Sequence, residues 1–115
     1  MSGEMMQQAI KLTQENDDEL VARIAARDHG AMRLASDRYT NMVWRVAYRM
    51  LGDAAEAEDI AQESLLKLWN HADRWNAGGP GIAPWLKKVT VNQCLDRLRR
   101  KRFAKRGFGI AGQAN

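Results

Sequence analysis

Apolar side chains recur at helical spacing along most of the chain, and this pattern predicts a bundle of helices. The longest periodic stretch runs from about Ala31 to Leu51, where an apolar stripe continues for about five turns. No segment alternates apolar and polar residues in the manner of a strand. We therefore expect an all-α fold, a compact bundle of three principal helices preceded by a short one. The stripe of the longest helix consists of Leu34, Ala35, Tyr39, Met42, Val43, Val46, Ala47 and Met50.

A second helix is predicted from Asp53 to His71, directly after the first. Gly52 suits the left-handed position that follows a helix, and Asp53 can cap the next one, so the two helices should pack as a hairpin. Glu56 has the spacing of the reciprocal partner of Asp53 in a capping box. The buried stripe of this helix is predicted to contain Ala57, Ala61, Leu65, Leu68 and Trp69, with Leu66 beside it and exposed.

Two further helices are predicted at the ends of the patterned region. A short helix should begin near Asp17, whose carboxylate can cap it, and the sequence Asp28-His29-Gly30 should end it. The last helix is expected from about Pro84 to Arg102, after a loop over residues 72–83. The apolar positions are Leu20, Val21, Ile24 and Ala25 in the short helix, and Trp85, Leu86, Val89, Cys94, Leu95 and Leu98 in the last one.

The length of 115 residues suits one domain. We predict a flexible segment over residues 1–16, a helical domain over residues 17–103 and a flexible tail over residues 104–115. The chain starts without the pattern of a signal peptide, and no apolar run approaches the roughly 20 residues that span a bilayer. Cys94 is the single cysteine and has no disulfide partner, so we expect a cytoplasmic protein that does not contact a membrane.

The net charge of +4 conceals two regions of opposite charge. Residues 87–106 contain nine basic residues and one acid, a net charge of +8, which leaves −4 for the rest of the chain. Such a basic segment favours a polyanionic partner, most often nucleic acid. The second helix instead carries five carboxylates before its first basic residue, and these form either a solvated face or a docking surface for a basic partner. The carboxylates belong to Asp53, Glu56, Glu58, Asp59 and Glu63.

Signals of catalysis are weak. His29 and His71 have no Cys, His or carboxylate at the spacing of metal ligands, so capping or surface positions are expected for both. The glycine-rich loop over residues 78–81 is not followed by the Lys-Ser/Thr of a phosphate-binding loop. Cys94 lies in the core-facing register of its helix, as a small buried hydrophobe would. We expect a protein that is not an enzyme and that needs no metal or cofactor.

Signals of nucleic-acid binding are stronger. Asn92 can form hydrogen bonds with base edges, and it shares a helix with Lys and Arg residues that can contact phosphates. Trp75 and Trp85 flank the glycine-rich loop and could stack on an unpaired base. The alternatives are that both tryptophans belong to the core and that the basic segment is a solvated tail or an RNA-binding arm.

Taken in order, these residues resemble region 2 of the extracytoplasmic-function (ECF) sigma factors of bacterial RNA polymerase. Two blocks carry the resemblance, A-E-D-x-x-Q-E at residues 57–63 and W-L-x-x-x-x-x-N-x-x-x-D-x-x-R-R at residues 85–100. Asp28, Ala31, Leu68 and Trp69 add to it, and the match covers about residues 18–103. Each block alone is moderate evidence for this family, and the two blocks together, in this order and spacing, are strong evidence.

The resemblance implies two binding surfaces. The acidic helix of this family docks on the coiled coil of the polymerase β′ subunit, which assigns that role to Asp59, Gln62, Glu63 and Leu66. The loop and last helix hold the non-template strand of the promoter −10 element, with a flipped base captured in the loop. A partner that masks both surfaces, an anti-sigma factor, is also implied. The residues assigned to DNA are Trp75, Trp85, Lys87, Lys88, Asn92, Asp96, Arg99 and Arg100.

The resemblance leaves two points open. Complete ECF sigma factors carry a second helical domain, region 4, for the −35 element, so the sequence predicts either an excised domain or a region 2 that acts alone. The loop over residues 76–81 does not reveal which base it would capture. The alternative function is a stand-alone basic helical module that binds RNA or duplex DNA without polymerase, a hypothesis that leaves the acidic helix unexplained.

Overall fold

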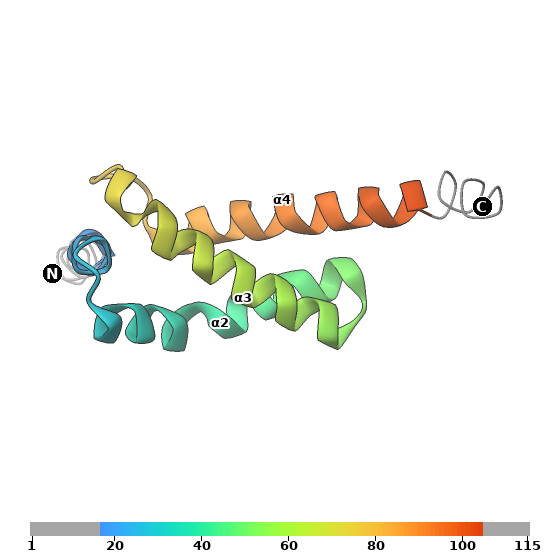
Figure 1. Ribbon diagram of the computed structural model, residues 1–115, viewed down its shortest axis with the longest axis horizontal. Helices are drawn as coiled ribbons and strands as arrows, with labels where there is room; N and C mark the ends of the chain where they lie inside the picture. Colours follow the sequence, from blue (N-terminus) through green and yellow to red (C-terminus); the bar gives the residue numbers. More distant parts are fainter. Residues whose placement is uncertain (1–16, 105–115) are drawn as a thin grey trace, which may run out of the picture.

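The computed structural model describes residues 17–104, which form helices joined by short connections (Figure 1). Residues 17–25 are helical and are called the leading helix below. The long helices are α2 (His29–Leu51), α3 (Ala54–His71) and α4 (Ile82–Phe103), and a 3-10 turn, η1 (Ala72–Arg74), follows α3. No strand occurs between residues 17 and 104, and the predicted all-α fold is confirmed. The predicted flexible segments over residues 1–16 and 104–115 lie outside the described residues, except for Ala104, which continues the helical end of α4.

Helices α2 and α3 form the predicted hairpin. Gly52 has φ 68° and ψ 17°, and its N–H donates to the Tyr48 carbonyl at 2.8 Å. Asp53 then accepts the Glu56 N–H through its side chain at 2.9 Å. The reciprocal half of the predicted capping box is wrong, because the Glu56 carboxylate forms an ion pair with Lys101 of α4 instead.

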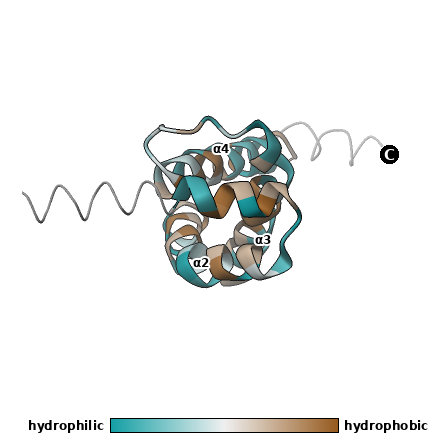
Figure 2. Ribbon diagram, turned by 90° about the vertical axis from the view of Figure 1, so that its left-hand side faces the viewer, coloured by the Kyte–Doolittle hydropathy of each residue, from teal (hydrophilic) through white to brown (hydrophobic). Residues whose placement is uncertain are grey.

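Helix α4 packs along both α2 and α3, and the leading helix lies across one end of this bundle. Figure 1 shows the leading helix end-on beside the start of α2, and Figure 2 shows it in front of the ends of the long helices. It ends at Ala25, and the turn that follows contains Arg27, which adopts the left-handed conformation with φ 67°. The Arg27 guanidinium donates to the Trp69 carbonyl at 2.9 Å and lies 4.6 Å from the centroid of its ring, which attaches the leading helix to the end of α3.

The core confirms most of the predicted stripes. A larger cluster joins the leading helix, α2, α3 and the first turns of α4, and Leu68 and Leu86 are fully buried in it. A smaller cluster of Ala47, Ala57, Ile60 and Cys94 lies nearer the hairpin turn. The larger cluster contains Leu20, Val21, Ile24, Ala31, Ala35, Val43, Ala61, Leu65, Leu68, Ala72, Ile82 and Leu86.

Two buried hydroxyls are satisfied inside this core. Ser64 of α3 and Thr90 of α4 are fully buried, and their oxygens lie 3.2 Å apart. Thr90 lies 2.7 Å from the Leu86 carbonyl oxygen, and Gln93 donates to the Ser64 oxygen at 2.6 Å. Because buried polar groups are costly unless they are paired, this network ties α3 and α4 together in one register.

Two predicted core positions are wrong. Leu34 is 38% exposed and Leu95 is 45% exposed. The buried stripe of α2 passes through Ala31 and Ala35. Leu34 is the residue before Ala35, so its side chain points about 100° away from Ala35 around the helix axis. The buried residues of α4 include Thr90, which the hydrophobic pattern could not identify because its side chain is polar.

The helix boundaries also differ from the prediction. Asp28 does not end the leading helix but caps α2, since its carboxylate accepts the N–H groups of Gly30 and Ala31 at 2.9 and 3.2 Å. The bond from Ala31, followed by the bond from the Arg23 guanidinium, lowers the pKa of Asp28. Helix α4 begins at Ile82, so Pro84 lies within its first turn as expected.

Candidate functional site

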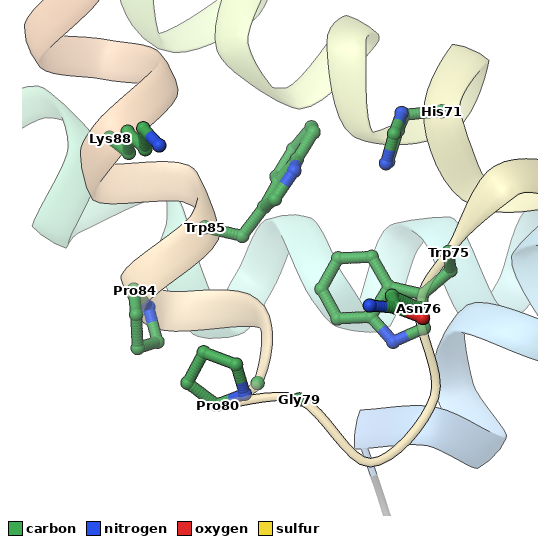
Figure 3. A pocket seen from close by; sticks show the side chains of 9 residues that line it. His71, Trp75, Asn76, Gly79, Pro80, Pro84, Trp85 and Lys88 are labelled. Atoms are coloured by element: carbon green, nitrogen blue, oxygen red, sulfur yellow. The ribbon is translucent and has the colours of Figure 1, made fainter.

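A pocket of about 330 Å³ opens at the end of the bundle, where α3 passes through η1 and a loop into α4. Three of the residues predicted to bind DNA, Trp75, Trp85 and Lys88, meet in it (Figure 3). The pocket lining is mainly aromatic and aliphatic, as in most sites for small organic groups. It consists of His71, Trp75, Asn76, Gly79, Pro80, Gly81, Pro84, Trp85 and Lys88.

The aromatic rings of this pocket come from three different segments. His71, near the end of α3, stacks on Trp85 of α4 with ring centroids 5.0 Å apart and an angle of 21°. Trp75 meets Trp85 edge-on, at 5.9 Å and 67°. Both tryptophans are half-buried and pack against the larger core cluster while they line the pocket, so the core interpretation holds only in part. Such rings offer flat apolar faces on which an unpaired base can stack.

The loop is held in place by two carboxylates of the leading helix. Asp17 accepts the Ile82 N–H at 3.0 Å and the Tyr39 hydroxyl at 3.1 Å. Asp18 accepts the Trp75 indole N–H at 3.1 Å and the Gly78 N–H at 3.0 Å. The prediction that Asp17 caps its own helix is therefore wrong, since its carboxylate serves the start of α4. Burial, with the Asp17 charge as the next cause, raises the pKa of Tyr39 and keeps its hydroxyl a donor.

An exposed stripe runs from the pocket along α4. Lys88, Asn92, Asp96 and Arg99 are all exposed and follow one another at three- or four-residue intervals, which places them on one face of the helix. Asp96 and Arg99 form an ion pair at 3.3 Å. The remaining predicted residues, Lys87 and Arg100, are exposed but lie on either side of this stripe.

The predicted docking residues form one outward face of α3. Asp59, Gln62, Glu63 and Leu66 are all exposed and lie within about two turns of the helix. Leu66 is 58% exposed, as predicted, and it lines a shallow hollow together with Gln62 and Trp69. We call these four residues the docking face.

Part of the basic segment turns toward α3 rather than outward. Arg97 lies 3.5 Å from Glu63, with a side chain that is only 19% exposed, and Lys101 pairs with Glu56. The positive charge of α4 is thus divided between contacts with the acidic helix and the exposed stripe. Sequence alone could not separate these two groups, because both lie in the same basic run.

Comparison with known proteins identifies the family of the chain. The sequence profile of the family described as Sigma-70 region 2 matches residues 36–104. The chain is 37% identical over 83 residues to the ECF RNA polymerase sigma factor SigL of Mycobacterium tuberculosis, a match that covers 72% of this chain and 47% of SigL. The chain belongs to the sigma-70 region 2 family.

Two other relatives show similar extents. SigW of Bacillus subtilis, also described as an ECF RNA polymerase sigma factor, is 30% identical over 71% of this chain and 43% of its own length. The RNA polymerase sigma-H factor of Pseudomonas aeruginosa is 31% identical over 76% of this chain and 45% of its own length. The chain therefore spans less than half the length of these relatives. Sigma factors are initiation factors rather than enzymes, so the family supports the prediction of a non-enzymatic protein.

The pocket and the contacts that hold its loop include residues that the sequence does not single out. His71 was expected at a capping or surface position, yet it stacks on Trp85 inside the pocket. Asp17 and Asp18 lie outside the segment matched by the family profile, and nothing in their local sequence identifies partners 57 to 65 residues away.

Three further findings concern metal ligands, membrane spans and the single cysteine. Within residues 17–104 no group of three His, Cys, Asp or Glu side chains is placed to hold a metal ion. None of the helices in this range is long and apolar enough to cross a membrane. Cys94 is fully buried, and burial raises the pKa of its thiol, which disfavours the reactive thiolate.

Proposed function

We propose that this region 2 domain acts in transcription initiation, by docking on RNA polymerase core and holding the non-template strand of a promoter −10 element. The observation that carries the proposal is the aromatic pocket that continues into a polar and basic stripe on α4. The docking face lies on a different helix, so a polymerase contact and a DNA contact can be made at once. The proposal places the protein in the cytoplasm, where polymerase and promoter are found.

In this proposal the pocket receives one base that has left the duplex. Unstacking a base costs a few kcal/mol, which stacking on Trp75 or Trp85 and phosphate contacts must offset. Lys88 stands at the edge of the pocket and Asn92 one turn further along α4, so they are suited to a phosphate and to a base edge. Arg99 extends the same path, with Lys87 and Arg100 as flanking phosphate contacts.

The docking face is proposed to bind the coiled coil of the β′ subunit. Asp59 and Glu63 supply negative charge, Gln62 supplies both a donor and an acceptor, and Leu66 supplies an apolar contact. Such a surface fits a partner with basic side chains around an apolar position. An anti-sigma factor that covers the same face would compete with polymerase, which explains how such a protein could be held inactive.

Charge reversal at Asp59 tests the docking proposal. Asp59→Lys should weaken binding to an isolated β′ coiled-coil fragment by at least about tenfold, because it places like charges against each other. We choose Asp59 because no ion pair to its side chain is found within residues 17–104, whereas Glu63 also contacts Arg97. Asp37→Lys on α2 is the matched control, an exposed acid with the same change of charge. Equal affinity of parent and Asp59→Lys, with helical content unchanged, would reject the docking proposal.

Salt dependence separates the two DNA roles. Arg99→Ala should reduce the dependence of single-strand affinity on salt by about 0.7 in the log–log slope, the value of one phosphate contact on a single strand. Asn92→Ala should weaken binding to the preferred sequence while the slope stays the same. Equal losses on every sequence would remove Asn92 as a base reader. Binding to RNA or duplex DNA without sequence preference, in the absence of polymerase, would favour the alternative of a basic helical module.

A further inference from the structure

The aromatic pocket between Trp75 and Trp85, which we call the base pocket after its proposed occupant, depends on two side chains that do not line it. The carboxylates of Asp17 and Asp18 each accept two hydrogen bonds, and three of the four donors belong to the loop or the start of α4. Neither residue is among those that line the pocket, and they reach the loop from outside. The two bonds of Asp18 close the chain between Trp75 and Gly78, and one bond of Asp17 fixes Ile82.

Asp17 replaces a cap that α4 does not have. The residue at the cap position is Gly81, which has no side chain to accept the free N–H groups of the first turn. The Asp17 carboxylate accepts one of them and places a negative charge at the positive end of the helix. The contact is tight, because a Cβ at Gly81 would lie 2.6 Å from the Asp17 Oδ2 atom. A side chain at residue 81 would therefore collide with the Asp17 carboxylate, so this contact requires a glycine there.

Asp18 controls the orientation of a pocket wall. One of its oxygens accepts the indole N–H of Trp75, which fixes the plane of the ring that meets Trp85 edge-on. The other oxygen accepts the N–H of Gly78, whose φ of 82° marks the turn of the loop. Without this carboxylate the indole N–H of Trp75 and the backbone N–H of Gly78 would both lose their acceptor. The pocket would then exist only in the fraction of molecules whose loop adopts this shape.

We propose that Asp17 and Asp18 are positioning residues that hold the base pocket in its binding shape before DNA arrives. A loop that is already ordered does not lose conformational freedom on binding, so preorganisation raises affinity without any new contact to the strand. The leading helix is thus part of the DNA-reading unit although it lies at the other end of the sequence. This inference rests on the proposed capture of an unpaired base in the pocket.

The test uses Asp18→Ala, because Asp17 is 6% exposed and its removal could prevent folding. The probe is a single-stranded DNA selected on the parent chain from a random pool, and binding is followed by fluorescence anisotropy. Asp18→Ala should weaken this binding by about tenfold, the factor that corresponds to 1.4 kcal/mol. Asp18→Asn, which keeps one acceptor oxygen, should recover part of the loss. Glu19→Ala, an exposed acid on the same helix, is the matched control and should bind like the parent.

A second measurement distinguishes positioning from general destabilisation. Strands that lack one base at a time identify the captured base, as the position whose removal weakens the parent chain most. On that abasic strand Asp18→Ala and the parent should bind equally, and both should keep the same affinity for the β′ coiled-coil fragment. An equal loss on intact and abasic strands, or no loss at all while the parent binds, would overturn the inference alone. A parent chain that binds no single strand would reject the proposed function and the inference with it.

Discussion

The docking face and the base pocket are built in opposite ways. The docking face consists of four side chains on about two turns of α3, and any correctly packed α3 presents them. The base pocket needs the end of α3, the loop, the first turns of α4 and the leading helix. One surface depends on a single helix, and the other depends on contacts across most of the described chain.

Because of this difference, substitutions on the docking face and substitutions in the base pocket should have different effects on the backbone. A change on the docking face alters charge or apolar area at the surface and leaves the backbone as it is. A change in the pocket acts on a loop whose glycines and hydrogen-bond acceptors are matched to one another, as Gly81 and Asp17 are. Docking should therefore tolerate loss of stability better than base capture does.

Removal of a core side chain below the docking face should have the largest effect. Leu68 is fully buried on α3, and Leu68→Ala should lower the free energy of unfolding by about 2–5 kcal/mol. Leu66→Ala on the exposed side of the same helix is the matched control and should stay within about 0.5 kcal/mol of the parent. Urea unfolding followed by circular dichroism gives both values. A large loss for Leu66→Ala would mean that the side chain packs against the protein itself and is not free for a partner.

The next largest effect is expected from the loop. Gly81 has φ 107° and ψ 179°, a region that side chains rarely enter, and Gly81→Ala should cost about 1–3 kcal/mol of strain. The added Cβ would also displace Asp17 from the start of α4. We expect single-strand binding to fall well before binding to the β′ fragment changes. Parallel losses of both activities would show that pocket and docking face are not independent.

The sequence predicts much of the fold and the exposure of the four docking-face residues for a physical reason. The periodicity of Leu65 and Leu68 determines which side of α3 is buried, and this leaves Asp59 and Leu66 on the other side. The same logic failed at Leu34 and Leu95, because an apolar side chain at the edge of a stripe can remain in solvent. Periodicity within one helix therefore locates the middle of a buried stripe more reliably than its edges.

The pocket could be predicted only in part. The sequence predicts that Trp75, Trp85 and Lys88 bind DNA, but their convergence with His71 depends on the path of the loop. Asp17 and Asp18 look like the ordinary first turn of a helix, and their carboxylates bind donors far along the chain. Nothing in a single sequence reports such pairings, because local patterns carry no information on long-range acceptors.

A smaller effect is expected at Tyr39, which supports Asp17 from α2. Tyr39→Phe removes one hydrogen bond to the Asp17 carboxylate and should cost roughly 1 kcal/mol. The raised pKa of Tyr39 means that the folded state keeps the phenol proton at a pH where the unfolded state loses it. Stability from this group is complete below the unfolded pKa near 10 and decreases as pH rises through the folded pKa. Tyr39→Phe should flatten the fall in stability above pH 10, and an unchanged profile would contradict the link.

The smallest effect concerns the ion pair between Glu63 of α3 and Arg97 of α4. Glu63 and Arg97 lie 3.5 Å apart with Glu63 half-exposed, so their coupling should be only about 0.2–1 kcal/mol and should decrease with salt. Glu63→Lys alone should both lose this coupling and weaken docking. The exchange Glu63→Lys with Arg97→Glu restores opposite charges across the pair, and it should recover stability without recovering affinity for the β′ fragment. Recovery of both would mean that Glu63 acts by holding α4 in place, and the docking face would then lose one of its four members.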